Sequence, residues 1–378
     1  MMNNKTRFIL ISNYTKDNQE SMQRYALNLR NDLRKKGIDV EVWYPRPLLG
    51  LLVHNTEYGL KKWLGYVDKW ILNMVLLKLK VLKESKKAFY HICDHSNAPY
   101  LQVLPTPRSG ITCHDVLAIQ GALGYNNAHC QSSKIGVLFQ KWIFNNLKKA
   151  KKLAAVSNYT LNQLLELCNN VKPDQASWEV IYNTFNADFR PMEISKRKRL
   201  LDQLGIYDKS YILHVGSNLP RKNRSMLIHM CKFIANWEGL IVFAGAPLEP
   251  SLENLIKEMN YENRVLNIIK PPHEDLVALY SGCLCFVFPS YSEGFGWPLI
   301  EAQACAAPVL TSEVDPMPEV SGGAAVHKDP HKPQDFANGL FYFLDENNRD
   351  YHINLGLDNC KRYDSEKLIN NFLKLYYD

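Results

Sequence analysis

One stretch of the chain decides the expected fold: Ser290-Tyr-Ser-Glu-Gly-Phe-Gly-Trp-Pro-Leu-Ile-Glu301. The run before it, residues 283–289, is apolar and rich in aromatic and β-branched residues, which is typical of a strand buried on both faces. Pro298 suits the first position of a helix, where no backbone N–H is needed, and apolar residues follow it. The local order is therefore strand, glycine turn and helix, and the unpaired N–H groups at the helix start predict an anion site.

Two carboxylates bracket this turn, with Glu293 before the glycines and Glu301 inside the helix. Gly294 and Gly296 could be taken for part of a dinucleotide fingerprint, but the third glycine is missing and an acidic residue precedes the turn. We therefore reject a dehydrogenase. At this point a purely structural alternative stays open, in which a tight turn joins a buried strand to a helix and both carboxylates are solvated or cap the helix.

Length and composition are those of a globular protein with two domains. At 378 residues the chain is longer than one hydrophobic core usually supports, and 46% hydrophobic with 22% charged residues is an ordinary balance. The nine cysteines are scattered and contain no Cys-x-x-Cys pair, which favours a reducing cytosol and argues against structural zinc. The apolar run 8–11 is too short for a signal-peptide core and predicts a buried first strand instead.

Strand-like and helical patterns alternate through both halves, which predicts an α/β fold with two Rossmann-like domains. In the first half we expect a helix over 22–36 and strands at 8–12, 40–44, 88–93, 109–114 and 153–157. In the second half we expect strands at 211–216, 240–245, 265–269 and 283–289, and a terminal helix over 363–377. The expected domains are residues 1–185, residues 186–360 and a C-terminal helix at 361–378.

Polar residues follow two expected strands of the first half. In an open α/β sheet, ligands gather at the carboxyl ends of the strands. Asp94 and His95 follow one strand, and His114 and Asp115 end the next. By residue type alone His114 is equally well a structural histidine, and the histidines lack metal-ligand spacing such as His-x-x-x-His. The sequence therefore predicts a ligand-binding edge here and no metal site.

Charge is distributed unevenly along the chain. Residues 1–185 contain 25 lysines and arginines against 13 acidic residues, whereas residues 186–378 contain 20 against 25. Eight of the lysines lie within residues 61–87, interleaved with aromatic and aliphatic residues. Asn73 and Lys78 interrupt the apolar run well short of the roughly 18 residues of a membrane span, so a transmembrane helix is not expected.

This basic segment predicts an amphipathic helix at the protein surface. An anionic membrane is one possible partner, because each juxtamembrane lysine adds about 1 kcal/mol toward it. Nucleic acid is not expected, because no helix-turn-helix, zinc finger or RNP-like motif accompanies the charge. A helix face that is simply solvated is the remaining alternative.

A second loop carries paired cations. The sequence Gly216-Ser-Asn-Leu-Pro-Arg-Lys-Asn223 joins an expected strand to a helix at the same sheet edge as the opening stretch. Arg221 supplies a planar fork of donors and Lys222 a mobile point charge, so together they can hold a diphosphate and offset charge growing on a departing phosphate. Paired basic residues on a surface loop are also commonly inert, and it is the combination with the acidic turn that indicates a site.

The combination resembles the retaining GT-B glycosyltransferases of family 4. The residues that carry the resemblance occur in the family's order from about residue 110 to 325: Thr112-Cys-His-Asp115, Val156-Ser-Asn-Tyr-Thr160, Arg221-Lys222-Asn223, Glu293-x7-Glu301 and Pro318-Glu-Val320. The resemblance implies the GT-B fold, in which two Rossmann-like domains face a central cleft and the C-terminal helix crosses back to the first domain. It also implies that the first domain binds the acceptor and the second the nucleotide sugar.

The resemblance further implies roles for single residues. Glu293 would contact donor-sugar hydroxyls, Glu301 the nucleotide ribose, and Arg221 with Lys222 the donor phosphates. His114 would lie beside the reacting carbon and the acceptor. No cofactor or metal is implied, because the basic pair and the helix dipole stand in for the divalent cation that other transferases use. The remaining expected contacts are Gly216, Ile269, Gly294, Phe295, Gly296 and Trp297 for the donor, and Asp94, His95, Asp115 and Ser21 for the acceptor.

Two loops depart from the family pattern. Many members have two glycines in the first strand–helix loop, whereas this chain has Asn13-Tyr-Thr-Lys-Asp-Asn-Gln-Glu-Ser21. Many members also have an arginine directly after the glycine of the phosphate loop, and here Ser217 takes that place. We therefore expect Arg221 to carry more of the phosphate charge.

The expected function is hexosyl transfer, with retention at the anomeric carbon, from a nucleotide sugar to a glycan or polyprenyl-linked acceptor in surface polysaccharide synthesis. GDP-mannose is the favoured donor, because the Arg-Lys-Asn loop and the Glu-Gly-Phe-Gly-Trp-Pro block are similar to mannosyltransferase-like members, and a UDP-sugar is the alternative. We expect a cytoplasmic protein that is peripheral on the inner face of the membrane. Other functions left open are a catalytically silent GT-B scaffold that binds a partner or membrane, and a glycoside hydrolase, which has no use for the cationic loop.

Overall fold

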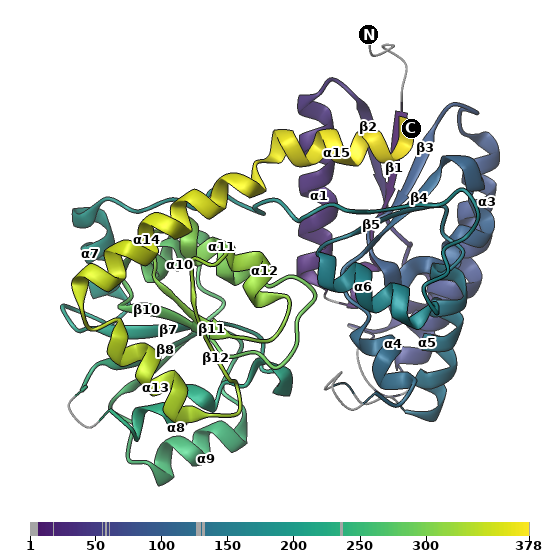
Figure 1. The fold of residues 1–378 in the computed structure, drawn as a ribbon. Coiled ribbons are helices and arrows are strands. Elements are labelled where there is room, and N and C mark those ends of the chain that lie inside the picture. Colours follow the sequence, from purple (N-terminus) through teal and green to yellow (C-terminus); the bar gives the residue numbers. More distant parts are fainter. Residues whose placement is uncertain are drawn as a thin grey trace. The chain divides into compact units, whose positions relative to one another are not determined.

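The computed structural model describes residues 7–17, 19–54, 56, 59, 61–125, 130, 133–234 and 237–377. Within them the chain forms two compact units. The first contains the residues up to Asn186 together with those from Ser365 onward, and the second is Ala187–Asp364. Each unit contains one six-stranded parallel sheet covered by helices (Figure 1). This confirms the predicted α/β class with two Rossmann-like sheets.

The first unit has the strand order β2-β1-β3-β4-β5-β6. Its strands are β1 (Arg7–Ile11), β2 (Asp39–Trp43), β3 (Phe89–Ile92), β4 (Ser109–Cys113), β5 (Lys152–Ala155) and β6 (Ser177–Val180). Its α-helices are α1 (Glu20–Lys35), α2 (Lys61–Val67), α3 (Asn73–Lys83), α4 (Leu117–Ala122), α5 (Lys134–Leu147), α6 (Asn158–Leu167) and α15 (Ser365–Tyr377). Short 3-10 turns lie at Thr15–Asp17, Leu49–Leu52, His95–Val103 and Thr106–Arg108.

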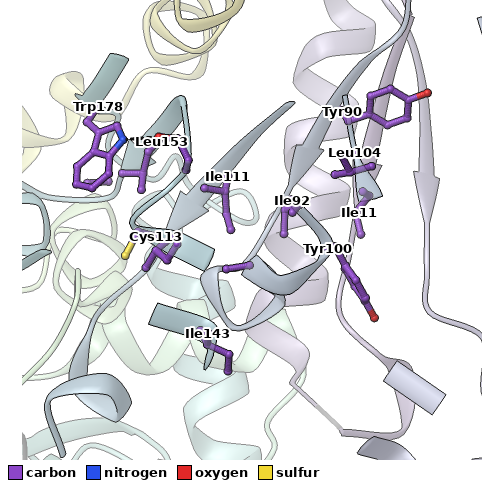
Figure 2. Packing of buried hydrophobic residues seen from close by; sticks show 14 of the residues in the cluster. Ile11, Tyr90, Ile92, Tyr100, Leu104, Ile111, Cys113, Ile143, Leu153 and Trp178 are labelled. Carbon is purple, nitrogen blue, oxygen red and sulfur yellow. Dashed lines mark hydrogen bonds between the residues drawn. The ribbon is translucent and has the colours of Figure 1, made fainter. Parts of the chain in front are cut away.

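The central strand β1 shows why this sheet is buried on both faces. Successive side chains of a strand point to opposite faces, so Ile9 and Ile11 enter one core cluster while Phe8 and Leu10 enter the other. Figure 2 shows the first cluster, in which Ile11, Ile92 and Ile111 of neighbouring strands pack side by side. The alternation explains why the sequence of β1 reads as one continuous apolar run.

Helix α15 closes the second face of the same sheet. Phe372 and Tyr376 of α15 pack on Phe8 of β1, with ring centroids 6.0 and 5.0 Å away. The Tyr376 hydroxyl lies 2.6 Å from His91 Nδ1 and donates to the Tyr90 carbonyl at 3.1 Å. Burial lowers the pKa of His91 to about 3, so this histidine is neutral and serves packing.

Residues 61–83 of the basic segment form helix, as predicted, but they are not one regular helix. A π-helical segment, Asp68–Leu72, separates α2 from α3. Asp68 is fully buried there and accepts hydrogen bonds from the Tyr14 hydroxyl at 2.6 Å and from backbone N–H groups at Leu48, Leu49 and Gly50 at 2.9 Å. These hydrogen bonds hold the preceding loop against the helix, and π segments of this kind often occur at functional sites.

The second unit has the strand order β12-β11-β10-β7-β8-β9. Its strands are β7 (Tyr211–Gly216), β8 (Leu240–Gly245), β9 (Val265–Ile269), β10 (Cys285–Phe288), β11 (Val309–Ser312) and β12 (Val326–Lys328). Its α-helices are α7 (Ile194–Gln203), α8 (Met226–Cys231), α9 (Pro250–Glu258), α10 (His273–Gly282), α11 (Trp297–Ala304), α12 (Met317–Ser321), α13 (Pro333–Tyr342) and α14 (Glu346–Cys360). Two 3-10 turns lie at Pro220–Lys222 and Lys361–Tyr363.

Strands β7, β8 and β9 have the predicted bounds, and β10 is shorter than predicted at both ends. Strands β6, β11 and β12 were not predicted. Among the described residues, no helix is long and apolar enough to cross a bilayer.

Candidate active site

The opening stretch forms the predicted strand, glycine turn and helix, but α11 begins at Trp297, so Pro298 is its second residue and not its first. All four residues of β10 are buried, and the chain leaves the strand through Pro289 and reaches Gly296, which precedes α11. Gly296 has a φ of +92°, a left-handed conformation that strains any residue with a side chain. A Cβ there would also come within 3.3 Å of Leu299, so glycine is required for the turn into the helix.

Glu293 lies in this turn and is only 5% exposed. Its Oε1 accepts a hydrogen bond from Lys222 Nζ at 2.6 Å, and its Oε2 lies 2.7 Å from Arg221 Nη1. Burial by itself raises the pKa of Glu293, but the charges of Lys222 and Arg221 outweigh burial and hold the pKa at about 2. The carboxylate is therefore ionised and fixed between two cations.

The cationic loop is held against the acidic turn by further contacts. Arg221 Nη1 donates to the Ser292 carbonyl at 2.9 Å, and the Tyr291 N–H donates to the Arg221 carbonyl at 2.8 Å. Asn223, at a φ of +50°, donates its amide to the Pro289 carbonyl at 3.1 Å. Burial lowers the pKa of Lys222, and Glu293 counteracts this shift. The two loops therefore form one rigid constellation of a carboxylate and two cations.

Glu301 lies on α11, five positions after Gly296, and is 6% exposed. Its Oε2 accepts a hydrogen bond from the hydroxyl of Tyr280 on α10 at 3.0 Å. Burial, followed by the charge of Glu301, raises the pKa of Tyr280 well above its usual value, so the tyrosine stays a donor. Tyr280 thus fixes one oxygen of the Glu301 carboxylate.

The other expected donor contacts of this unit fall at the same sheet edge. Strand pairing sets Gly216 opposite Gly245 and Gly245 opposite Ile269, the last residue of β9, which is 56% exposed. A Cβ at Gly216 would lie 3.9 Å from the Lys222 side chain. Gly294 and Phe295 are buried in the turn itself, and the Phe295 ring lies 6.1 Å from that of Trp297.

Three buried polar side chains around this constellation were not predicted. His214 of β7 binds the Val287 carbonyl through Nδ1 at 3.0 Å, and burial lowers its pKa to about 3. In the described part of the chain, the other ring nitrogen of His214 and the hydroxyls of Ser290 and Ser292 are buried without a hydrogen-bond partner. Buried polar atoms of other described residues, such as the Ser12 hydroxyl and the Trp237 ring nitrogen, also lack a partner, so this feature alone does not mark a ligand site. A histidine inside the apolar run of β7 was the available sequence signal.

The first unit contains a second polar cluster at the carboxyl edge of its own sheet. Asp94, two residues after β3, accepts hydrogen bonds from the Asn13 amide and from the Ser96 hydroxyl, the latter at 2.7 Å. His95 Nδ1 lies 3.3 Å from Asp94 Oδ1. Burial raises the pKa of Asp94, but His95, His114 and the hydrogen bonds outweigh it and lower the pKa. Asp94 is therefore an ionised carboxylate inside the unit.

His114 belongs to this cluster. It is 6% exposed, its Nε2 lies 2.8 Å from the Cys93 carbonyl oxygen, and its backbone N–H points to His95 Nδ1 at 3.4 Å. The ring of Tyr25 on α1 stands edge-on to it, 4.7 Å away. Burial lowers the pKa of His114, so the ring is neutral at physiological pH.

The other two expected acceptor residues have different surroundings. Asp115 accepts from the Leu117 N–H at 3.0 Å and so caps its own turn, while Ser21 lies exposed in the first turn of α1. Asn13, Gln19 and Asn97 were not predicted but are hydrogen-bonded to one another in the cluster, with Asn97 donating to Asn13 at 3.1 Å. In the loop that contains Asn13 and Gln19, Asn18 lies outside the described residues.

A cavity of about 310 Å³ adjoins this cluster. Polar side chains of Asn13, Gln19 and Ser96 line one part of it, and the aromatic rings of Tyr66 and Trp70 line another. Aromatic faces with hydrogen-bonding groups beside them suit a sugar ring. The described residues contain no group of three or more metal-ligating side chains.

Comparison with solved structures identifies the fold. Sucrose-phosphate synthase from Thermosynechococcus elongatus superimposes on 98% of the chain, with a TM-score of 0.75 and 18% identity, and 98% of that protein is covered. Anabaena HepE, solved in complex with UDP and glucose, covers 97% of the chain with a TM-score of 0.72 and 16% identity, and 98% of HepE is covered. The protein has the GT-B glycosyltransferase fold.

Sequence comparison adds a family match over part of the chain. Residues 196–354, almost the whole second unit, match the model of the family glycosyl transferases group 1. The O-antigen chain mannosyltransferase B of Escherichia coli is 25% identical over 63% of this chain and 63% of its own length. The O-antigen chain mannosyltransferase RfbU of Salmonella typhimurium is 26% identical over 72% of this chain and 69% of its own length.

Proposed function

We propose that this protein transfers a hexosyl unit, with mannose favoured, from a nucleotide sugar to a glycan or lipid-linked acceptor in the synthesis of a surface polysaccharide. The observation that carries the proposal is the buried Glu293 carboxylate fixed between Lys222 and Arg221 at 2.6 and 2.7 Å. A cationic pair suits a donor diphosphate, and a rigid carboxylate beside it suits the sugar hydroxyls.

Other residues at the carboxyl edge of the second sheet suit the remaining parts of a nucleotide-sugar donor. Glu301, oriented by Tyr280, is suited to accept hydrogen bonds from the two ribose hydroxyls. The exposed Ile269 at the end of β9 offers an apolar face to a base. Sugar, diphosphate, ribose and base thus each have a chemically matched residue in one unit.

The proposed reaction is same-face displacement with retention at the anomeric carbon. The acceptor oxygen bonds to that carbon, the bond to the leaving diphosphate breaks, and the acceptor proton passes to a phosphate oxygen. Arg221 and Lys222 stabilise the charge on the departing diphosphate, which is the task that a divalent cation performs in other enzymes. Glu293 orients the sugar, and the neutral His114 is assigned to the acceptor side.

A mannosyl donor is favoured because the two O-antigen relatives are named as mannosyltransferases. GDP-mannose is therefore our first choice of donor. A UDP-sugar is the second, because HepE, which shares the fold, was solved with UDP and glucose. Neither relative identifies the acceptor of this protein.

Glu293→Ala tests the proposal, with Glu262→Ala as a matched control, because Glu262 is an exposed glutamate of the same unit. We expect sugar transfer from GDP-mannose or a UDP-sugar to fall by at least 100-fold in E293A and to stay unchanged in E262A. Circular dichroism and gel filtration establish that E293A is folded. A folded E293A protein with full activity would show that the assignment is wrong.

We also propose that the basic segment of residues 61–87 places the enzyme on an anionic membrane. Ile71, Val75, Leu79 and Leu82 recur at helical spacing and are 59%, 58%, 51% and 74% exposed, with lysines around them. This is the pattern of a helix lying in the membrane interface. Sedimentation with anionic and with neutral vesicles at low salt tests it, and equal binding to both would remove the electrostatic part of the proposal.

A further inference from the structure

A second cavity of the first unit, of about 240 Å³, is largely apolar and is not used by the proposed reaction. Ile11 and Trp43, the last residues of β1 and β2, line it, so it lies at the carboxyl edge of the sheet. Leu76 and Leu79 of α3 and the ring of Tyr100 add to its lining. Ligands of open α/β sheets bind at this edge, so the location favours a binding site over a packing defect.

The charged residues that line this cavity are all positive. Arg46, Lys80 and Lys83 line it, and no acidic side chain is among its described lining residues. Lys80 Nζ lies 4.8 Å from the Trp43 ring centroid. Glu41 attracts Lys80 but is already paired with Arg7 at 2.5 Å. An apolar hollow rimmed by three cations therefore matches an amphiphile with an apolar chain and an anionic head.

We propose that this cavity binds the phosphorylated end of a single-chain lipid, with the first part of the chain in the hollow and the phosphate on Arg46, Lys80 and Lys83. One chain is chosen over two because the volume is small, and a phosphate monoester or diphosphate because three cations suit more than one negative charge. The inference rests on the proposed function in one respect, since it assigns this lipid to the acceptor.

The position of the polar cavity supports that assignment. Trp70 lines the polar cavity and Tyr100 the apolar one, and their ring centroids are 5.5 Å apart, so the two cavities share a wall. The Tyr100 hydroxyl donates to the Lys69 carbonyl at 3.0 Å, which fixes this wall to the π-helical segment. A lipid phosphate and a sugar attached to it can therefore occupy neighbouring sites of the same unit.

Binding is tested without any sugar donor, so that it does not depend on transfer. Hexyl, octyl and decyl phosphate are titrated calorimetrically into the full chain, below the concentrations at which they form micelles. Each added methylene that enters the hollow should tighten binding roughly four-fold until the hollow is full. Octanol, which lacks the phosphate, and inorganic phosphate, which lacks the alkyl chain, are the controls. Each should bind at least 10-fold more weakly than octyl phosphate.

The head-group contacts are tested with Lys80→Gln/Lys83→Gln. The matched control is Lys148→Gln/Lys149→Gln, which makes the same change of charge at exposed lysines of the same unit, outside both the cavity and the basic segment. Loss of two charge-assisted contacts should weaken octyl phosphate binding by about 10- to 100-fold in the first variant and leave it unchanged in the second. Leu76→Trp, which fills the hollow, should abolish the dependence on chain length.

Equal binding by the two lysine variants, or octanol binding as tightly as octyl phosphate, would overturn the proposal. Farnesyl phosphate and a short-chain phosphatidylglycerol distinguish the two sources of lipid phosphate, and equal affinity for both would overturn the choice of a single-chain lipid. If the protein transfers sugar but binds no alkyl phosphate, the lipid-binding proposal is wrong and the proposed function stands. If it binds alkyl phosphate but transfers no sugar, the lipid-binding cavity stands and the proposed function is wrong.

Discussion

Replacement of Glu293 by glutamine should destabilise the second unit in a way that depends on pH. The pKa of Glu293 falls from 4.5 to about 2 on folding. Since one pKa unit corresponds to about 1.4 kcal/mol, the ionised carboxylate contributes about 3 kcal/mol to the free energy of unfolding at neutral pH. The side chain is buried, so solvent does not screen this interaction.

The sign follows from the direction of the shift. A carboxyl whose pKa is lowered in the folded state gives stability that is fully present above its unfolded pKa and is lost as the pH falls through its folded pKa. For Glu293 that window runs from 4.5 down to about 2. Near pH 3.5, roughly 2 of the 3 kcal/mol remain. Glu293→Gln should therefore cost about 3 kcal/mol at pH 7 and about 2 kcal/mol near pH 3.5.

The measurement must report on the second unit alone. Hydrogen exchange of the buried amides of β10, followed by mass spectrometry and corrected for the intrinsic pH dependence of exchange, does so. Glu262→Gln, an exposed position of the same unit, should change the opening free energy by less than about 0.5 kcal/mol. Equal losses in the two variants, or a loss in E293Q that is the same at both pH values, would refute the reasoning.

Two further predictions concern the donor and helix α15. GDP at about 100 times its dissociation constant should raise the free energy of unfolding by about 2.7 kcal/mol, and UDP and ADP at the same concentration should raise it less. A thermal-shift panel of the three nucleotides measures these effects. A larger effect of UDP than of GDP would reverse our order of donors. Tyr376→Phe should cost about 1 to 2 kcal/mol, because His91 Nδ1 loses its partner at 2.6 Å, and Tyr376→Ala about 3 to 5 kcal/mol, because it also leaves a cavity. Urea unfolding of both variants measures the difference, and equal losses would contradict a packing role for the ring.

Much of the fold was predictable because long apolar runs fix buried strands. The runs 211–216, 240–245 and 265–269 became β7, β8 and β9 with the same bounds. The start of α11 was predictable for a local reason as well, since Gly296 at positive φ and the proline after it can end a turn and begin a helix.

The parts that escaped prediction depend on tertiary packing. The π segment Asp68–Leu72 is set by Asp68, whose hydrogen bonds reach Tyr14 and the loop 48–50, all distant in the sequence. The unpaired nitrogen of His214 depends on what packs around β7. The identity of the site residues as donor and acceptor contacts stays a prediction.

What the sequence could not show is which loops meet, and one topological rule accounts for both polar clusters. In the second sheet the order β12-β11-β10-β7-β8-β9 reverses between β10 and β7, so the loops after these two strands open a crevice. Glu293 and Lys222 lie in those loops and meet although 71 positions separate them. In the first sheet the order reverses between β1 and β3, and there Asn13 after β1 meets Asp94 after β3. The residue types were readable from the sequence, but their pairing follows from strand order, which no local pattern contains.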